Sequence, residues 1–193
     1  MNNIPEIRTF FALPCGETLS QNIDEKVVFL RECSGIKGTP SHEYHITLKF
    51  LGETPINLLE ETKENLYRTI GQIPSFTLKL SSTGTFPKGS HPRILWIGSY
   101  FAPLALRQIV LQLNLLFKAY GYPREERRFK PHITIARVKG DPSKVCLEKF
   151  MNLNCEGMFL KATDVIWYES KLSPVGPEYI ERMRIPLNLE KGR

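Results

Sequence analysis

The sequence predicts an α+β fold made mainly of antiparallel β-sheet. Strand-like segments outnumber helical ones, and several follow one another without an intervening helix. No G-x-G-x-x-G string follows the first predicted strand, which argues against a doubly wound parallel sheet. A strand, a helix and a second strand that begins with a His-x-Thr string occur once in each half, at His45 and at His132. This order indicates an internal duplication.

The first predicted elements are a strand and a helix. Residues 8–13 are rich in Phe and Thr, which favour strands, and Pro14 ends the run. Residues 18–31 repeat apolar side chains at close to helical spacing, and a glycine follows. Residues 35–43 contain two glycines and a proline, and we predict a loop there.

The second strand and second helix follow directly. Residues 45–51 predict a strand that stops at Gly52. Thr54 and Pro55 have the residue types of a helix start, so the helix is predicted to begin there and to end at Gly71.

The later elements repeat these patterns. Residues 103–120 form the strongest predicted helix, with apolar residues along one side and Gly121 after it. A shorter helix is expected after the second His-x-Thr strand. The remaining predicted strands are residues 76–80, 94–97, 132–138, 159–160, 165–168 and 179–187.

Bulk composition predicts one domain over residues 1–193, without a membrane segment. The net charge of +6 and the pI of about 9.2 suggest modest affinity for a polyanion. No apolar run reaches the roughly 18 residues of a membrane span, and the N-terminus lacks the pattern of a signal peptide. We therefore expect a cytoplasmic protein that needs no protein partner and is a monomer.

Four cysteines, at positions 15, 33, 146 and 155, have no C-x-x-C spacing and no nearby histidine. A zinc site and a disulfide framework are both disfavoured by this spacing and by the absence of a secretion signal. We expect four reduced thiols. No His, Asp and Glu cluster has the spacing of a metal site, so no metal and no cofactor is predicted.

The two His-x-Thr strings carry the expected chemistry. They read His45-Ile46-Thr47-Leu48 and His132-Ile133-Thr134-Ile135. Side chains two apart on a strand share a face, so each string places an imidazole beside a hydroxyl, with its apolar residues toward a core. Two imidazoles that face one cleft can act as acid and base on a phosphate ester, because histidine titrates near neutral pH.

The sequence resembles the 2H phosphoesterase superfamily, named for two H-x-T-x motifs, and within it the RNA 2′,3′-cyclic phosphodiesterases, also called the 2′-5′ RNA ligase family. The resemblance covers nearly the whole chain. The segments that carry it are RTFFAL (8–13), HITLKFLGE (45–53), RILWIG (93–98), FKPHITIAR (129–137) and SKLSPVGPEY (170–179).

The resemblance implies two pseudo-symmetric, intertwined lobes of antiparallel sheet with outer helices, and a central cleft with one H-x-T-x motif on each wall. It also implies hydrolysis of RNA 2′,3′-cyclic phosphate ends to 2′-phosphates, with weak reverse joining of tRNA halves through a 2′-5′ linkage. By resemblance His45 is the proton donor and His132 the proton acceptor, although the residues themselves leave that order open.

Further residues are candidates for phosphate and base contacts. Thr47 and Thr134 are predicted to bond the non-bridging phosphate oxygens, although threonine is also an ordinary strand residue. Arg137 can clamp phosphate, but strict alternation puts it on the face opposite His132 unless the strand bulges. Phe10 or Phe11 are candidates for stacking a terminal base, with core packing expected for at least one of them.

Two basic features have open interpretations. Lys49 is predicted to share a strand face with His45, where it either touches RNA or is solvated. The residues Arg124, Arg127, Arg128 and Lys130 precede the second motif and either hold an RNA backbone or form a solvated face.

RNA with 2′,3′-cyclic phosphate ends, tRNA fragments included, is the predicted substrate. Two other functions remain open at this point. One is the same chemistry on a small nucleotide, such as ADP-ribose 1″,2″-cyclic phosphate or a 2′-5′ oligoadenylate. The other is an RNA-binding module without catalysis, against which the two intact histidines argue.

Overall fold

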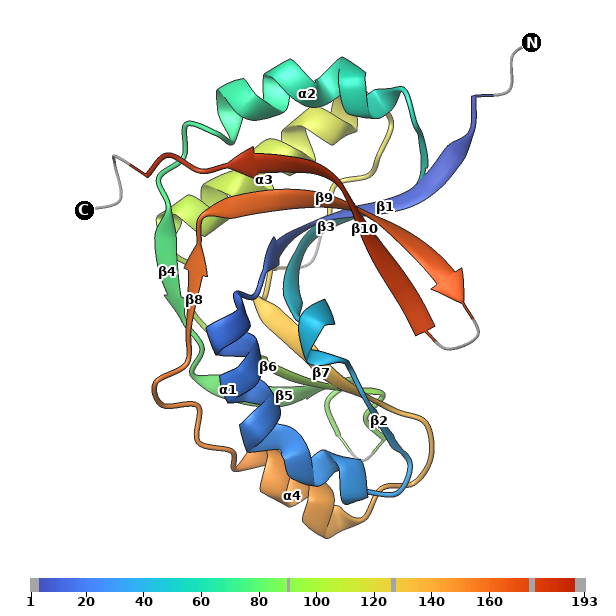
Figure 1. Cartoon of the computed structure of the whole chain (residues 1–193), viewed down its shortest axis with the longest axis vertical. Coiled ribbons are helices and arrows are strands. Elements are labelled where there is room, and N and C mark those ends of the chain that lie inside the picture. Colours follow the sequence, from blue (N-terminus) through green and yellow to red (C-terminus); the bar gives the residue numbers. More distant parts are fainter. Residues whose placement is uncertain (1–3, 90, 126–127, 174–175, 190–193) are drawn as a thin grey trace.

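The computed structural model describes residues 4–89, 91–125, 128–173 and 176–189 (Figure 1). Within these ranges the elements, in chain order, are β1 (Glu6–Pro14), α1 (Glu17–Val27), β2 (Ile36–Gly38), β3 (His45–Pro55), α2 (Leu58–Thr69), β4 (Phe76–Lys79), β5 (Ser82–Phe86), β6 (Ile94–Gly98), α3 (Leu104–Ala119), β7 (His132–Val138), α4 (Lys144–Met151), β8 (Phe159–Ala162), β9 (Asp164–Ser173) and β10 (Gly176–Pro186). Two short 3₁₀ helices, Val28–Glu32 and Ser41–Glu43, follow α1 and precede β3.

The strands form one large sheet and one small one. The large sheet has eight strands in the described chain, in the order β10-β9-β1-β3-β7-β6-β5, and β2 also pairs with β7. Its neighbouring strands are antiparallel throughout. β4 and β8 make the small sheet. The predicted α+β class with mainly antiparallel sheet is therefore confirmed.

The large sheet has two halves that meet at one place. In the described residues, β3 and β7 are in register only at Ile46 and Ile133. Figure 1 shows the strands spreading apart from this junction, with β1, β9 and β10 on one side and β5, β6 and β2 on the other. Helices α2 and α3 lie beside the first group, and α1 and α4 beside the second. Each group is thus covered partly by helices that follow strands of the other.

The core forms where the apolar stripes of the helices meet the sheet. Helix α3 turns Leu106, Ile109, Leu113 and Phe117 inward, and all four are fully buried. These are stripe residues that the periodicity of residues 103–120 predicts. Most of the buried apolar residues of the described chain, from both halves, belong to a single cluster.

The end of β3 and the start of α2 differ from the sequence prediction. β3 continues past Gly52, which takes a φ of 79° that L side chains rarely adopt, and ends at Pro55. Thr54 is therefore not a helix cap. Its hydroxyl is buried, accepts from Thr9 at 2.9 Å and donates to the Gly52 carbonyl at 3.0 Å. Helix α2 starts later, at Leu58.

Two strands were missed because their sequences are short or polar. β2 lies inside the predicted loop at residues 35–43, and it is a strand only because β7 supplies its hydrogen bonds. β5 reads Ser-Thr-Gly-Thr-Phe and lacks an apolar alternation. β2 exists through pairing with a strand distant in the sequence, which local patterns do not record, and β5 exists through pairing with β6, the next strand of the chain.

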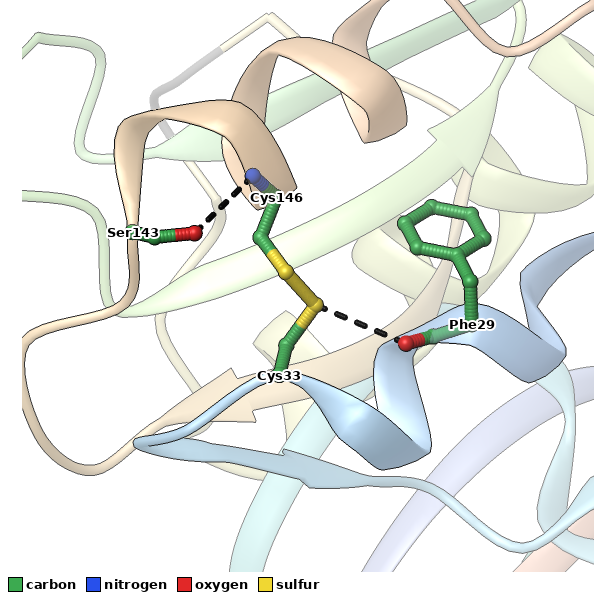
Figure 2. Close-up of a disulfide and its surroundings, with 4 residues drawn as sticks. All are labelled: Phe29, Cys33, Ser143 and Cys146. Carbon is green, nitrogen blue, oxygen red and sulfur yellow. Dashed lines mark hydrogen bonds between the residues drawn. A yellow bond between two sulfur atoms is a disulfide. The ribbon is translucent and has the colours of Figure 1, made fainter.

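The expectation of four reduced thiols is wrong for two of them. Cys33 and Cys146 form a disulfide between the segment after α1 and the helix α4 (Figure 2). Their Cα atoms lie 6.2 Å apart, within the range of such bridges, although 113 residues separate them in sequence. Because of that separation, the spacing of the cysteines along the sequence does not indicate the pair. Ser143 caps α4 by accepting from the Cys146 amide at 3.2 Å (Figure 2), and Cys15 and Cys155 are free.

Among the described helices, none combines the length and the apolar character that crossing a membrane requires.

Candidate active site

Two histidines begin neighbouring strands, as the sequence predicts. β3 begins at His45 and β7 at His132, and Ile46 lies opposite Ile133 where the two strands meet. Both isoleucines are fully buried. Because side chains alternate along a strand, the two imidazoles project from the other face of the sheet, and both are half-buried there.

The two threonines share that face. Extending the register by one residue in each direction sets His45 opposite Thr134 and Thr47 opposite His132. Both threonines are half-buried, like the histidines. The junction between the two halves of the sheet therefore carries two imidazoles and two hydroxyls on one surface.

The same backbone contact orients both rings. The Nδ1 atom of His45 lies 2.6 Å from the Glu43 carbonyl oxygen, and that of His132 lies 2.7 Å from the Lys130 carbonyl oxygen. A carbonyl oxygen only accepts, so Nδ1 carries a hydrogen in each ring. In each neutral imidazole Nε2 is then the unprotonated nitrogen. Both histidines thus offer the same atom for proton transfer.

A β-bulge follows each motif. In the pairing of β1 with β3, Phe11 faces Lys49 and Ala12 faces Thr47, which leaves Leu48 as the extra residue. In the pairing of β6 with β7, Ile135 is the extra residue at the matching position. A bulge shifts the alternation by one residue, so the side chains beyond it change faces.

The second bulge brings Arg137 to the site. Without it, Arg137 would lie on the face opposite His132. With it, Arg137 is exposed and lines the same cavity as Thr134. The sequence predicted that Arg137 reaches the site only if the strand bulges, and Ile135 is the extra residue of that bulge.

The first bulge has the opposite effect on Lys49. The prediction that Lys49 shares a face with His45 is wrong, because Leu48 and Lys49 both turn toward the core. The Lys49 ammonium is buried and donates to the Asn114 side-chain oxygen at 3.0 Å and to the Pro123 carbonyl at 2.9 Å. It ties β3 to α3 and to the segment after it.

The cavity in front of the motifs has a volume of about 600 Å³. The predicted site residues Phe10, His45, Thr47, Thr134 and Arg137 line it. His132 is not among the lining residues. It precedes Thr134 by two residues on the same face of β7, and its ring packs edge-on against Phe86 with 5.0 Å between ring centres.

Aromatic rings support each histidine differently. The His45 ring lies 5.1 Å from Phe10 and 5.2 Å from Tyr179, measured between centres. Phe10 is only 3% exposed, so it forms a wall behind His45 more than an open surface for a base. Phe11 is fully buried against Trp167, with 4.6 Å between ring centres, and is therefore the ring of the two that packs in the core, as expected for at least one of them.

Burial lowers the pKa of both histidines below the ordinary value. For His45 the nearby His132 lowers the pKa further, and the bond to the Glu43 carbonyl opposes both effects. For His132 the second lowering influence is the charge of Lys130. In the free protein, both rings therefore favour the neutral form at neutral pH.

Several residues that line the cavity in front of the motifs were not predicted from the sequence. Arg8 lies two positions before Phe10 on β1, and alternation alone would have placed it on the cavity side. Its guanidinium lies over the Phe50 ring, 4.9 Å from the ring centre. Lys37 and Lys139 were hidden because β2 reads as a loop. Tyr179 lies on β10, far in the sequence from both motifs, so no local pattern indicates that it lines the cavity.

The basic segment before the second motif divides in the structure. Arg127 lies outside the described residues, and Arg124 and Arg128 are exposed. The Lys130 ammonium lies 3.8 Å from the centre of the Trp96 ring and 5.0 Å from that of Tyr100. Within the described part of this segment, Lys130 is thus the cation beside His132. Among the described residues, no three His, Cys, Asp or Glu side chains gather as a metal site would need.

An antiparallel sheet that carries two His-x-Thr strings on one face has the arrangement of the 2H phosphoesterases. The chain belongs to the 2′-5′ RNA ligase superfamily, whose family model matches residues 22–168.

Two similar proteins bear the name RNA 2′,3′-cyclic phosphodiesterase. The one from Methanocaldococcus jannaschii is 32% identical over 180 residues, which cover 90% of this chain and 96% of that protein. The one from Thermus thermophilus is also 32% identical, over 194 residues that cover 97% of this chain and 93% of that protein. The family predicted from the sequence is confirmed.

Solved structures agree in fold. The crystal structure of TT0787 from Thermus thermophilus superimposes with a TM-score of 0.82 at 26% identity, and covers 95% of this chain and 100% of that one. E. coli LigT in its apo form gives a TM-score of 0.76 at 24% identity, and covers 95% of this chain and 99% of that one. The second likeness concerns the fold alone.

Proposed function

We propose that the protein hydrolyses 2′,3′-cyclic phosphate ends of RNA to 2′-phosphates and 3′-hydroxyls. The observation that carries this proposal is the matched pair His45 and His132, which start adjacent strands and offer Nε2 on one face. The names of the relatives from Methanocaldococcus jannaschii and Thermus thermophilus support the same substrate.

The reaction needs one proton removed and one supplied. Water attacks phosphorus and gives its proton to Nε2 of His132. The bond from phosphorus to the ribose 3′ oxygen breaks, and the imidazolium form of His45 gives its Nε2 proton to that oxygen. The Lys130 charge supports this order, because it favours the neutral, basic form of His132. Each proton transfer of this kind typically contributes about 10²–10⁴ in rate.

The remaining groups bind the phosphate. The hydroxyls of Thr47 and Thr134 donate to the non-bridging oxygens, and the Arg137 guanidinium neutralises the charge that develops on them. Arg8, from β1, adds a second positive charge to the cavity. Since the imidazoles move the protons and the guanidinium groups bind the anion, we expect turnover without a metal ion.

We also propose that residues 1–193 act as one domain and as a cytoplasmic monomer. The single buried cluster and the sheet that runs through both halves support one domain. The site takes its residues from one chain, which is compatible with a monomer. Among RNAs with cyclic phosphate ends, tRNA fragments are candidate substrates.

The test is incubation with an oligoribonucleotide that ends in a 2′,3′-cyclic phosphate, followed by mapping of the product. We expect a 2′-monoester, at a rate that EDTA leaves unchanged. His45→Ala and His132→Ala should each lower kcat at least about 100-fold and leave RNA affinity nearly unchanged. His42→Ala is the matched control, because His42 is exposed and does not line the cavity in front of the motifs.

Three results would contradict this function. RNA binding without hydrolysis by the wild-type protein would indicate a binding module. Faster turnover of a small cyclic nucleotide than of RNA would move the substrate to that class. Loss of activity in EDTA with recovery in Mg²⁺ would refute the two-histidine mechanism.

A further inference from the structure

An exposed aromatic surface lies at the connection between β6 and α3. Tyr100 is 70% exposed and Phe101 is 76% exposed. Leu104 follows at the start of α3 and is 63% exposed. Adjacent large apolar side chains with this much exposure are unusual on a protein that binds nothing there.

Cations accompany these rings. A small cavity of about 220 Å³ is lined by Tyr100, Phe101, Ala102, Arg107, Val110, Arg128 and Phe129. Two arginines and no acidic residue are among these described lining residues. Arg107 and Arg128 are exposed, and neither forms an ion pair with any residue that the structure describes. We call Tyr100, Phe101, Arg107 and Arg128 the aromatic platform.

The platform adjoins the second histidine. Gly98, the last residue of β6, pairs with His132, and the next amide, of Ser99, donates to the Pro131 carbonyl at 3.0 Å. The side chains continue this contact, since the Lys130 ammonium lies near both Tyr100 and Trp96. The Trp96 ring centre is 6.2 Å from that of His132. An RNA strand that leaves the site past His132 therefore meets the platform directly.

We propose that the aromatic platform binds the bases and backbone of the RNA strand that precedes the terminal cyclic phosphate. This inference rests on the proposed function. Exposed aromatic rings interleaved with arginines are the composition that binds single-stranded nucleic acid, because rings stack on bases and guanidinium groups contact phosphates. The positive charge and the continuity with the catalytic face favour RNA over a protein partner.

We expect the effect of substrate length on KM to depend on the platform alone. Phe101→Ser removes a stacking ring, and Arg107→Gln removes a phosphate contact. Tyr100 is left intact because it contacts Lys130, which bears on His132. For an oligonucleotide of about ten nucleotides, we expect the double variant to raise KM about 10-fold or more, with kcat unchanged. For a 2′,3′-cyclic mononucleotide, both constants should stay at their wild-type values.

The control is Val145→Ser on α4. Val145 is 73% exposed, as the platform rings are, but it lines neither the platform cavity nor the cavity in front of the motifs. This variant should behave like the wild type on both substrates. Raising the salt concentration should weaken oligonucleotide binding more steeply for the wild type than for the double variant, because fewer phosphate contacts remain in the variant.

Failure of this inference is distinguishable from failure of the proposed function. Equal changes on both substrates, or none on the oligonucleotide, would refute the platform while hydrolysis stands. If the wild type hydrolyses neither substrate, fluorescence anisotropy with a labelled oligonucleotide that ends in a 3′-phosphate decides: unchanged affinity in the double variant refutes the platform, and weaker affinity supports it. A change in sedimentation with unchanged RNA affinity would mark the surface as a protein interface and also refute the proposal.

Discussion

At the scale of single residues, the two reactive histidines are alike in backbone contact and different in surroundings. Each donates from Nδ1 to the carbonyl two residues earlier. His45 is enclosed by Phe10 and Tyr179, whereas His132 has the charged Lys130 nearby. The equal contacts keep Nε2 available in both rings, and the unequal surroundings support the different roles that we propose for them.

The pH dependence of kcat/KM should reflect both lowered pKa values. The base must be neutral, so the rate falls as pH drops through its pKa. The acid must be protonated, so the rate falls as pH rises through the pKa of the acid. Since the pKa of His45 and that of His132 both lie below the ordinary value, we expect a bell-shaped profile with both midpoints below about 6.5. Its measurement requires a buffer series at constant ionic strength.

Lys130→Met provides the matched variant for this profile. The substitution removes the ammonium but keeps the backbone carbonyl that holds His132. Without the nearby charge the pKa of His132 should rise, so one midpoint moves upward and the other stays. An optimum above pH 8 in the wild type, or identical profiles for the two proteins, would contradict this account of the site.

At the scale of elements, the two bulges decide which side chains reach the cavity. The extra residues Leu48 and Ile135 each follow the threonine of a motif. Beyond them, Lys49 turns into the core, and Arg137 turns toward the cavity in front of the motifs. The duplicated motif is thus a duplicated piece of backbone geometry as well as of sequence.

The pairing of β5 with β6 is also constrained, at Gly84. Gly84 lies opposite Trp96, and a Cβ there would overlap the buried indole ring. Gly84→Ala must displace Trp96, which packs against His132 and Lys130. We expect a loss of about 1–3 kcal/mol in the free energy of unfolding and a fall in kcat, measured by urea denaturation and by turnover.

Gly16→Ala is the comparison for that prediction. Gly16 precedes α1, and a Cβ there would meet no atom within 4 Å. Its effect on stability should be well below that of Gly84→Ala, and kcat should not change. If Gly84→Ala keeps full stability and full activity, Trp96 is not needed to support His132.

The sequence predicted elements whose signal is local. The period-two pattern of the His45 and His132 strands and the apolar stripe of residues 103–120 are both confirmed. What it missed depends on distant partners. β2 forms by pairing with β7, and the hydroxyl of Thr54 on β3 is hydrogen-bonded to that of Thr9 on the neighbouring strand β1. The face of Lys49 depends on a bulge that alternation cannot reveal, because the extra residue is an ordinary leucine.

At the scale of the whole molecule, crossing connections link the two halves, and a disulfide joins two elements of one half. Helix α1 follows β1 but lies beside the strands of the other half (Figure 1). Cys33, beyond α1, is joined to Cys146 of α4, so that two helices on the same half are tied together (Figure 2). The bridge closes a long loop of chain, which restricts the unfolded state.

The disulfide should therefore contribute to stability when it is formed. We expect dithiothreitol to lower the free energy of unfolding of the oxidised protein by about 2–4 kcal/mol, measured by urea denaturation. The double variant Cys33→Ser and Cys146→Ser should resemble the reduced wild type and should not respond to dithiothreitol. A wild type that is equally stable in both conditions would show that the bridge does not constrain the chain.

The single junction at Ile46 and Ile133 has a consequence for how the molecule accommodates a polymer. When two rigid plates turn about a shared point, displacement grows with distance from that point. His45 and His132 are immediate neighbours of the junction, so small rotations barely alter their separation. Leu172, at the far end of β9, travels much farther for the same angle. A rotation of one half against the other would therefore change the width of the outer cavity more than the spacing of the two Nε2 atoms.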